Sequence, residues 1–143
     1  MAEDNQDAVS LDSLLVPEKT IELEFPGFDG LTFKVCYLSR DELIKLRKVC
    51  VSTKFNRRSR QPEDVLDEDK FLEEYTKRVV KGWSGFKYKY LEEFLLADIS
   101  NLDPQMCMPY NEANAKSLMK QSAIFDDWLT DVVSDLNAFT TAS

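Results

Sequence analysis

Histidine is absent from the 143 residues of this chain. Its absence removes the side chain that titrates nearest neutral pH, the usual base beside a serine or cysteine nucleophile, and the commonest metal ligand. Cysteine occurs at three distant positions, Cys36, Cys50 and Cys107, which supply neither a disulfide framework nor a paired zinc motif. The sequence therefore predicts no enzymatic activity, no metal and no cofactor, and it predicts three reduced thiols packed as small apolar groups.

Basic residues are also scarce, because 18 of them stand against 26 acidic residues and leave a net charge of -8. Nucleic-acid backbones are bound mainly through lysine and arginine, so nucleic acid is not an expected partner. No apolar run approaches the roughly 20 residues that cross a bilayer. The first ten residues, MAEDNQDAVS, are acidic where a secretion signal would be basic. We therefore expect a soluble cytoplasmic protein that binds no membrane.

The patterns that are present predict a mainly α-helical domain with a small amino-terminal β-hairpin. Alternating apolar residues on both sides of a Pro-Gly-Phe-Asp-Gly turn predict the hairpin at about 20–37. Ser39 and Glu42 form a capping box at the start of the first helix. A flexible acidic arm at 1–19 precedes this single domain of 20–139, and a short tail at 140–143 follows it. Helical periodicity predicts helices at about 39–50, 67–81, 90–96, 111–121 and 123–139.

A basic stretch at 54–62 lacks apolar periodicity, which predicts an exposed loop. Its cations favour self-association with an acidic face of another subunit. A nucleic-acid contact over the basic residues from Lys45 to Arg60 is the alternative, since cations beside Phe55 suit phosphate binding with base stacking, but the overall acidity disfavours it. The candidate self-association residues are Lys54, Arg57, Arg58 and Arg60.

Acidic residues gather just after this stretch, and Asp64, Asp67 and Asp69 suggest a magnesium-dependent nuclease as a further alternative. A catalytic metal site needs carboxylates that converge from rigid elements. Here they stand at a predicted helix start, where negative charge suits the helix dipole. A solvated helix start is therefore the favoured interpretation.

Two motifs and an aromatic helix occupy the second half of the chain. The first motif is KGWSGF at 81–86, and the second is MPYNEANA at 108–115. Phe125 and Trp128 then follow in the last predicted helix. In this order, over about residues 70 to 139, the sequence resembles the tail assembly chaperones of long-tailed bacteriophages.

The resemblance implies a mostly helical protein that binds the tape measure protein and keeps it soluble in the host cytoplasm until the tail tube polymerises around it. It implies self-association and absence from the mature virion. In many members a ribosomal frameshift makes a longer product, through which the tail tube protein would be a second partner. A structural tail or neck protein that stays in the virion is the alternative.

A tape measure protein is a long helical chain with apolar stripes, so its partner needs an apolar, adaptable surface on a soluble body. Aromatic and methionine side chains of the second half of the chain can supply that surface. Most of the apolar stripe of the last helix should enter the core, with Leu129 and Phe139 as its outer members. The candidate partner-binding residues are Trp83, Met106, Met108, Tyr110, Trp128, Leu129 and Phe139.

Overall fold

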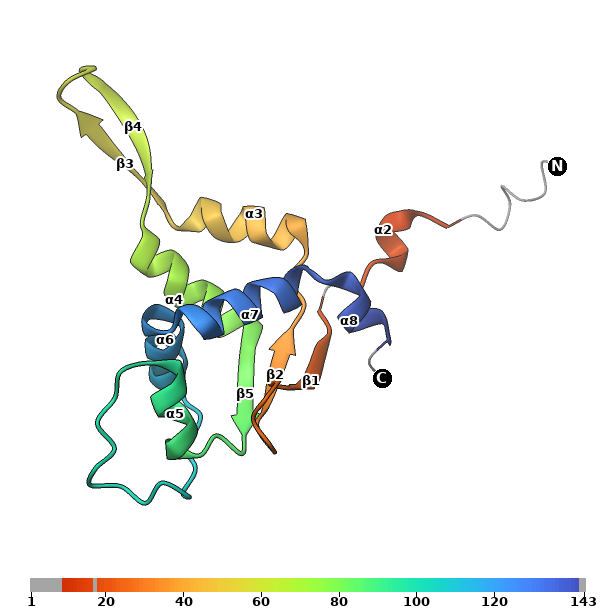
Figure 1. Ribbon diagram of the computed structural model, residues 1–143. Helices are drawn as coiled ribbons and strands as arrows, with labels where there is room; N and C mark the ends of the chain where they lie inside the picture. The colour runs from red at the N-terminus through yellow and green to blue at the C-terminus, as the bar shows by residue number, and fades with distance from the viewer. Residues whose placement is uncertain (1–8, 17, 142–143) are drawn as a thin grey trace.

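The computed structural model describes residues 9–16 and 18–141 (Figure 1). Residues 1–8 and 17 of the predicted arm, and 142–143 of the predicted tail, lie outside the described residues. The remainder of the arm contains a short helix. In chain order the elements are α2 (Leu11–Leu14), β1 (Thr20–Glu24), β2 (Thr32–Cys36), α3 (Arg40–Val49), β3 (Val51–Asn56), β4 (Gln61–Leu66), α4 (Glu68–Val79), β5 (Val80–Ser84), α5 (Tyr88–Phe94), α6 (Glu112–Gln121), α7 (Ala123–Ser134) and α8 (Leu136–Thr141).

Three antiparallel strands in the order β1-β2-β5 form the main sheet. The predicted hairpin is β1 and β2, with Leu23 opposite Phe33. β5 follows α4 directly and pairs with the other edge of β2, so that Trp83 lies opposite Phe33. The side chain of Phe33 is fully buried against Phe125 and Trp128 of α7. The core therefore lies between this sheet and the helices.

The predicted mainly α-helical class is wrong. Among the described residues, 46% lie in helices and 22% in strands, the strands form two sheets of three and two, and the fold is α+β. The sequence does not predict β5. The apolar period of α4 continues through Val79 and Val80, so the predicted helix runs on to residue 81 and covers the start of this strand. β-branched valines at a helix end are weak helix formers, and here the second one begins a strand.

The second sheet is a two-stranded ribbon, β3 and β4, in place of the loop predicted at 54–62. Its strands pair from Val51 with Leu66 to Asn56 with Gln61. A tight turn joins them, in which Arg60 has a positive φ of 58° and the carboxamide of Asn56 accepts backbone N–H groups. Because both faces are largely polar, the ribbon has no apolar alternation from which it could be predicted.

The helix predicted at 123–139 is interrupted at Asp135, which has an extended backbone. The carboxylate of Asp135 accepts the N–H of Asn137, and this bond competes with continuation of the helix. The chain turns there into α8, which brings the Phe139 ring against Tyr37 with centroids 5.2 Å apart. Among residues 9–16 and 18–141, no helix is long and apolar enough to cross a bilayer.

Candidate partner-binding surfaces

A groove of about 560 Å³ opens between α3, α4 and α7. α3 supplies one wall, α4 the floor and α7 the other wall, and α3 and α7 run alongside each other in Figure 1. Most of the lining is apolar or aromatic. The apolar and aromatic residues are Tyr37, Leu38, Leu43, Phe71, Leu72, Tyr75, Met119 and Val133.

The amino-terminal cap of α3 and one ion pair with α4 position this helix. The Ser39 hydroxyl accepts the N–H of Glu42 at 3.2 Å, as the predicted capping box requires. The Glu42 carboxylate instead accepts a 3.1 Å hydrogen bond from Arg78 of α4. Leu46 is the one residue of α3 that is fully buried, so most of the inner face of this helix is left to line the groove.

The two walls of the groove carry opposite charges. Arg40 and Arg47 line it from α3, and Asp126 lines it from α7. The Arg47 guanidinium lies over the Phe71 ring, 5.3 Å from its centroid, which is an arrangement favourable to a cation. Burial, and then the nearby Asp126 carboxylate, raise the pKa of Tyr75 above the ordinary tyrosine value, so its hydroxyl is neutral in the groove.

The predicted residues Trp83, Met108 and Tyr110 come together beside β5. The Trp83 indole donates a 2.9 Å hydrogen bond to the Met108 carbonyl, and the Tyr110 hydroxyl donates one of 2.8 Å to the Val80 carbonyl. The two rings pack edge to face with centroids 5.1 Å apart. These half-buried side chains join β5 to the segment that leads into α6.

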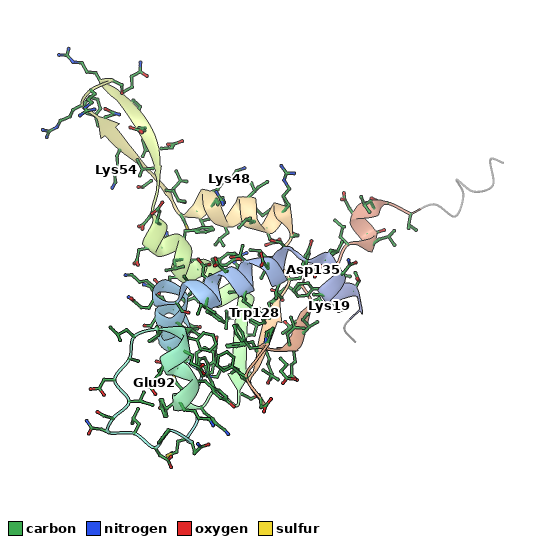
Figure 2. The ribbon with its side chains drawn as sticks, in the orientation of Figure 1. Lys19, Lys48, Lys54, Glu92, Trp128 and Asp135 are labelled. Carbon is green, nitrogen blue, oxygen red and sulfur yellow. The ribbon has the colours of Figure 1, made fainter. Side chains whose placement is uncertain are left out.

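Trp128 lies against the sheet (Figure 2), where its ring packs on Phe25 and Phe33. The Trp83 ring packs on Phe33 too, so Phe33 links Trp128 to that cluster. The prediction that Leu129 and Phe139 are outer members of the apolar stripe is wrong, because their exposed fractions are 0% and 2%. Leu129 is buried because α7 packs flat against the sheet and α6. Phe139 is buried because the break at Asp135 turns α8 back onto Tyr37.

A smaller hollow of about 200 Å³ lies between α5 and α6, and Met108 lines it with Leu91, Leu95 and Leu118. Exposed apolar side chains occur in the loop between these helices, at Leu96, Leu102 and Met106. The Cys107 thiol is exposed in the same loop, whereas Cys36 and Cys50 are buried. The expectation of a packed thiol is therefore wrong for Cys107.

The predicted self-association residues Lys54, Arg57, Arg58 and Arg60 all lie on the ribbon, at or near its tip, and are exposed. Within residues 9–16 and 18–141, none of the ion pairs involves these four side chains. Phe55, beside them, is 66% exposed. The ribbon therefore presents free positive charge and an aromatic ring to the solvent.

The three carboxylates of the nuclease alternative have separate partners. Asp64 accepts the Thr53 hydroxyl across the ribbon, and Asp67 caps α4 by accepting the N–H of Lys70. Asp69 pairs with Lys116 at 3.3 Å and also with Lys120. In the described part of the chain, no three carboxylate, thiol or imidazole side chains gather to hold a metal ion.

Sequence reasoning missed the groove, because each of its three helices reads as an ordinary amphipathic helix. The available signal was an excess of apolar positions near the start of α3 and on α4, at Leu43, Phe71, Leu72 and Tyr75. Comparison of the chain with protein-family models, curated proteins and solved structures finds no match. Its function must therefore be argued from its own residues.

Proposed function

We propose that this protein is a phage tail assembly chaperone that binds the tape measure protein and keeps it soluble. The observation that carries the proposal is the open apolar groove between α3, α4 and α7 on a strongly acidic chain. The order of the motifs at 81–86 and 108–115 supports the same function by resemblance.

The groove suits an amphipathic helix, which would place its apolar side chains on Leu43, Leu72 and Val133. Burial of each large apolar side chain is worth about 1.5 to 3 kcal/mol. Met119 of α6 also lines the groove, and its flexible thioether would help the groove fit successive segments of differing shape. Opposite charges on the two walls would orient the bound helix, with its acids toward α3 and its bases toward α7.

Solubility of the complex would come from the net charge of -8. In this proposal the chaperone acts in the host cytoplasm, and the polymerising tube takes its place on the tape measure protein, so the mature virion lacks it. A longer frameshifted product would add a contact with the tail tube protein. Neither nucleic acid nor a membrane has a part in this function.

Co-expression with the tape measure protein of the same genome tests the proposal. The wild-type chain should keep that protein in the soluble fraction and co-purify with it. Thr130→Arg places a long charged side chain at an exposed position of the groove and should lower recovery at least tenfold. The matched control is Thr20→Arg, an identical change at an exposed position of β1 that should leave recovery unchanged.

Equal aggregation of the tape measure protein with and without this chain would exclude the chaperone function. Mass spectrometry of purified virions separates it from the structural alternative. A chaperone should be missing from those particles, whereas a tail or neck protein should be present in a fixed number of copies.

A further inference from the structure

The β3–β4 ribbon projects away from the rest of the molecule and is exposed along nearly its whole length (Figure 1). Val51 at its base and Phe55 near its tip are 39% and 66% exposed. An isolated two-stranded ribbon is marginal in water, because it buries too little apolar surface to offset the cost of ordering it. A ribbon of this length gains stability when another surface covers one of its faces.

Charge distinguishes the ribbon tip from everything else in the chain. Residues 54–60 carry +4 and contain no acid, so the other residues together carry -12 against the net charge of -8. The sequence of α7 has no basic residue at all. The ribbon tip is therefore a small positive region in a chain whose other residues, taken together, are strongly negative.

α7 presents an exposed acidic face that complements the positive ribbon tip. Ile124, Asp127 and Asp131 follow one another at spacings of three and four, which places them on one side of α7, and Asp135 caps its carboxyl end. Ile124 is 53% exposed, and the three aspartates are exposed too. No ion pair in the described residues involves these carboxylates.

We propose that the ribbon tip of one copy docks on this face of α7 in a second copy. Arg57 and Arg58 would pair with Asp127 and Asp131, and the Phe55 ring would lie against Ile124. In each aspartate–arginine contact a planar guanidinium meets a carboxylate, a geometry that allows two parallel hydrogen bonds.

If each ribbon tip docks on the α7 of the other copy, the two copies form a closed dimer with two-fold symmetry, the commonest symmetry of self-associating proteins. The docked ribbon must come from a second copy because, within one chain, the ribbon points away from α7 (Figure 1). Figure 2 places Lys54 on the ribbon, far from Trp128 and Asp135. The -12 carried by the residues outside the tip would repel a nucleic-acid backbone, which makes an acidic protein face the better partner for the tip.

This dimer would leave the groove open, because the groove residues of α7 stand on another side of the helix. Asp126, Thr130 and Val133 line the groove, while Asp127 and Asp131 face away from them by the helical spacing. Self-association and tape measure binding are thus separable, and either can fail without the other.

Sedimentation analysis of the purified full chain at micromolar concentration tests the proposal. The wild-type chain should be a dimer, and dissociation should increase as salt is raised from about 0.1 M to about 1 M. Arg57→Glu with Arg58→Glu should raise the dimer dissociation constant at least tenfold, and so should Asp127→Arg with Asp131→Arg. A mixture of the two variants should form a heterodimer, because each ribbon tip then meets an α7 face of opposite charge.

The matched control for the arginine variant is Lys48→Glu with Lys81→Glu, which changes two exposed lysines outside the ribbon and α7. It alters the net charge of the chain by the same amount as Arg57→Glu with Arg58→Glu. It should leave the dimer intact. A wild-type monomer, a dimer unaffected by the arginine changes, or a mixture that stays monomeric would overturn the proposal. Binding of single-stranded DNA by the wild-type chain, lost in the arginine variant without any change in sedimentation, would also overturn it and assign the tip to nucleic acid.

Discussion

The indole N–H of Trp83 donates a 2.9 Å hydrogen bond to the carbonyl oxygen of Met108, so the two motifs on which the phage resemblance rests are in direct contact. Tyr110 reaches back in the same way to Val80 at 2.8 Å. The aromatic residues of these motifs therefore hold the sheet to the segment before α6. A sequence pattern that points to a family can thus reflect a shared fold before it reflects a shared binding site.

Trp83→Phe should lower the free energy of unfolding by roughly 1 to 3 kcal/mol, because it keeps an aromatic ring but leaves the Met108 carbonyl without its donor. Urea denaturation measures the change. Tyr88→Phe, on a half-buried tyrosine of α5, is the control and should change stability little. If Trp83→Phe leaves stability unchanged but reduces recovery of the tape measure protein, then the indole faces the partner instead of the fold.

Gly85→Ala should be among the most damaging single changes in the chain. Gly85 has a φ of +69°, and an added Cβ would collide with the carbonyl oxygen of Gly30 in the β1–β2 turn. Because that neighbour is backbone, the turn and the end of β5 would have to separate, and we expect a loss of about 3 kcal/mol or more.

Gly27→Ala separates backbone strain from this collision. Gly27 also has a positive φ, of +88°, but nothing lies within 4 Å of the added Cβ. Its cost should be limited to about 1 kcal/mol of conformational strain. Thermal unfolding of the two variants side by side gives the comparison, and equal losses would show that the close approach of Gly85 to Gly30 does not stabilise the fold.

The elements that the sequence predicts well carry their own local signals. Ser39, Asn111 and Ser122 each cap a helix with a side-chain oxygen, and the turn at 26–30 lies between two alternating strands. The information sits within a few residues of each boundary, so one sequence suffices. The start and type of these elements could therefore be read before any packing was known.

The elements that the sequence predicts poorly depend on distant pairing. β5 exists because β2 offers an edge to Val80 and Trp83, and the ribbon exists through polar cross-strand bonds such as that of Asn56 with Glu63. The groove depends on the placement of α3 against α4, to which the Arg78–Glu42 pair joins it. These long-range pairings produce no periodic pattern of apolar residues in the sequence, so the sequence alone does not predict them.

The stability of the fold should fall in alkaline solution partly through Tyr75. Burial and Asp126 raise the pKa of this tyrosine above its unfolded value, so the fold favours the neutral form. Its contribution is fully present below pH about 10 and is lost as pH rises through the folded pKa. Urea unfolding across this range should show a shallower decline for Tyr75→Phe than for the wild-type chain.

Asp126→Asn is the control for this effect. Removing the carboxylate should lower the pKa of Tyr75 only in part, because burial is the larger cause. Some alkaline decline should remain in both variants, since burial and Glu112 also raise the pKa of Tyr110. A Tyr75→Phe profile that matches the wild-type profile at every pH would show that Tyr75 is solvated in the folded chain.

The thiols should react in two classes. Cys107 is exposed in the loop between α5 and α6, whereas Cys36 and Cys50 are buried. A thiol reagent such as dithiobisnitrobenzoate should therefore modify one cysteine rapidly and the other two only when the fold opens. Cys107→Ser should abolish the fast phase without a change in stability, while the slow phase should accelerate in urea. Rapid reaction of a second thiol in the Cys107→Ser variant would mean that α3 or β2 opens readily, since Cys50 caps the carboxyl end of α3 and Cys36 is the last residue of β2.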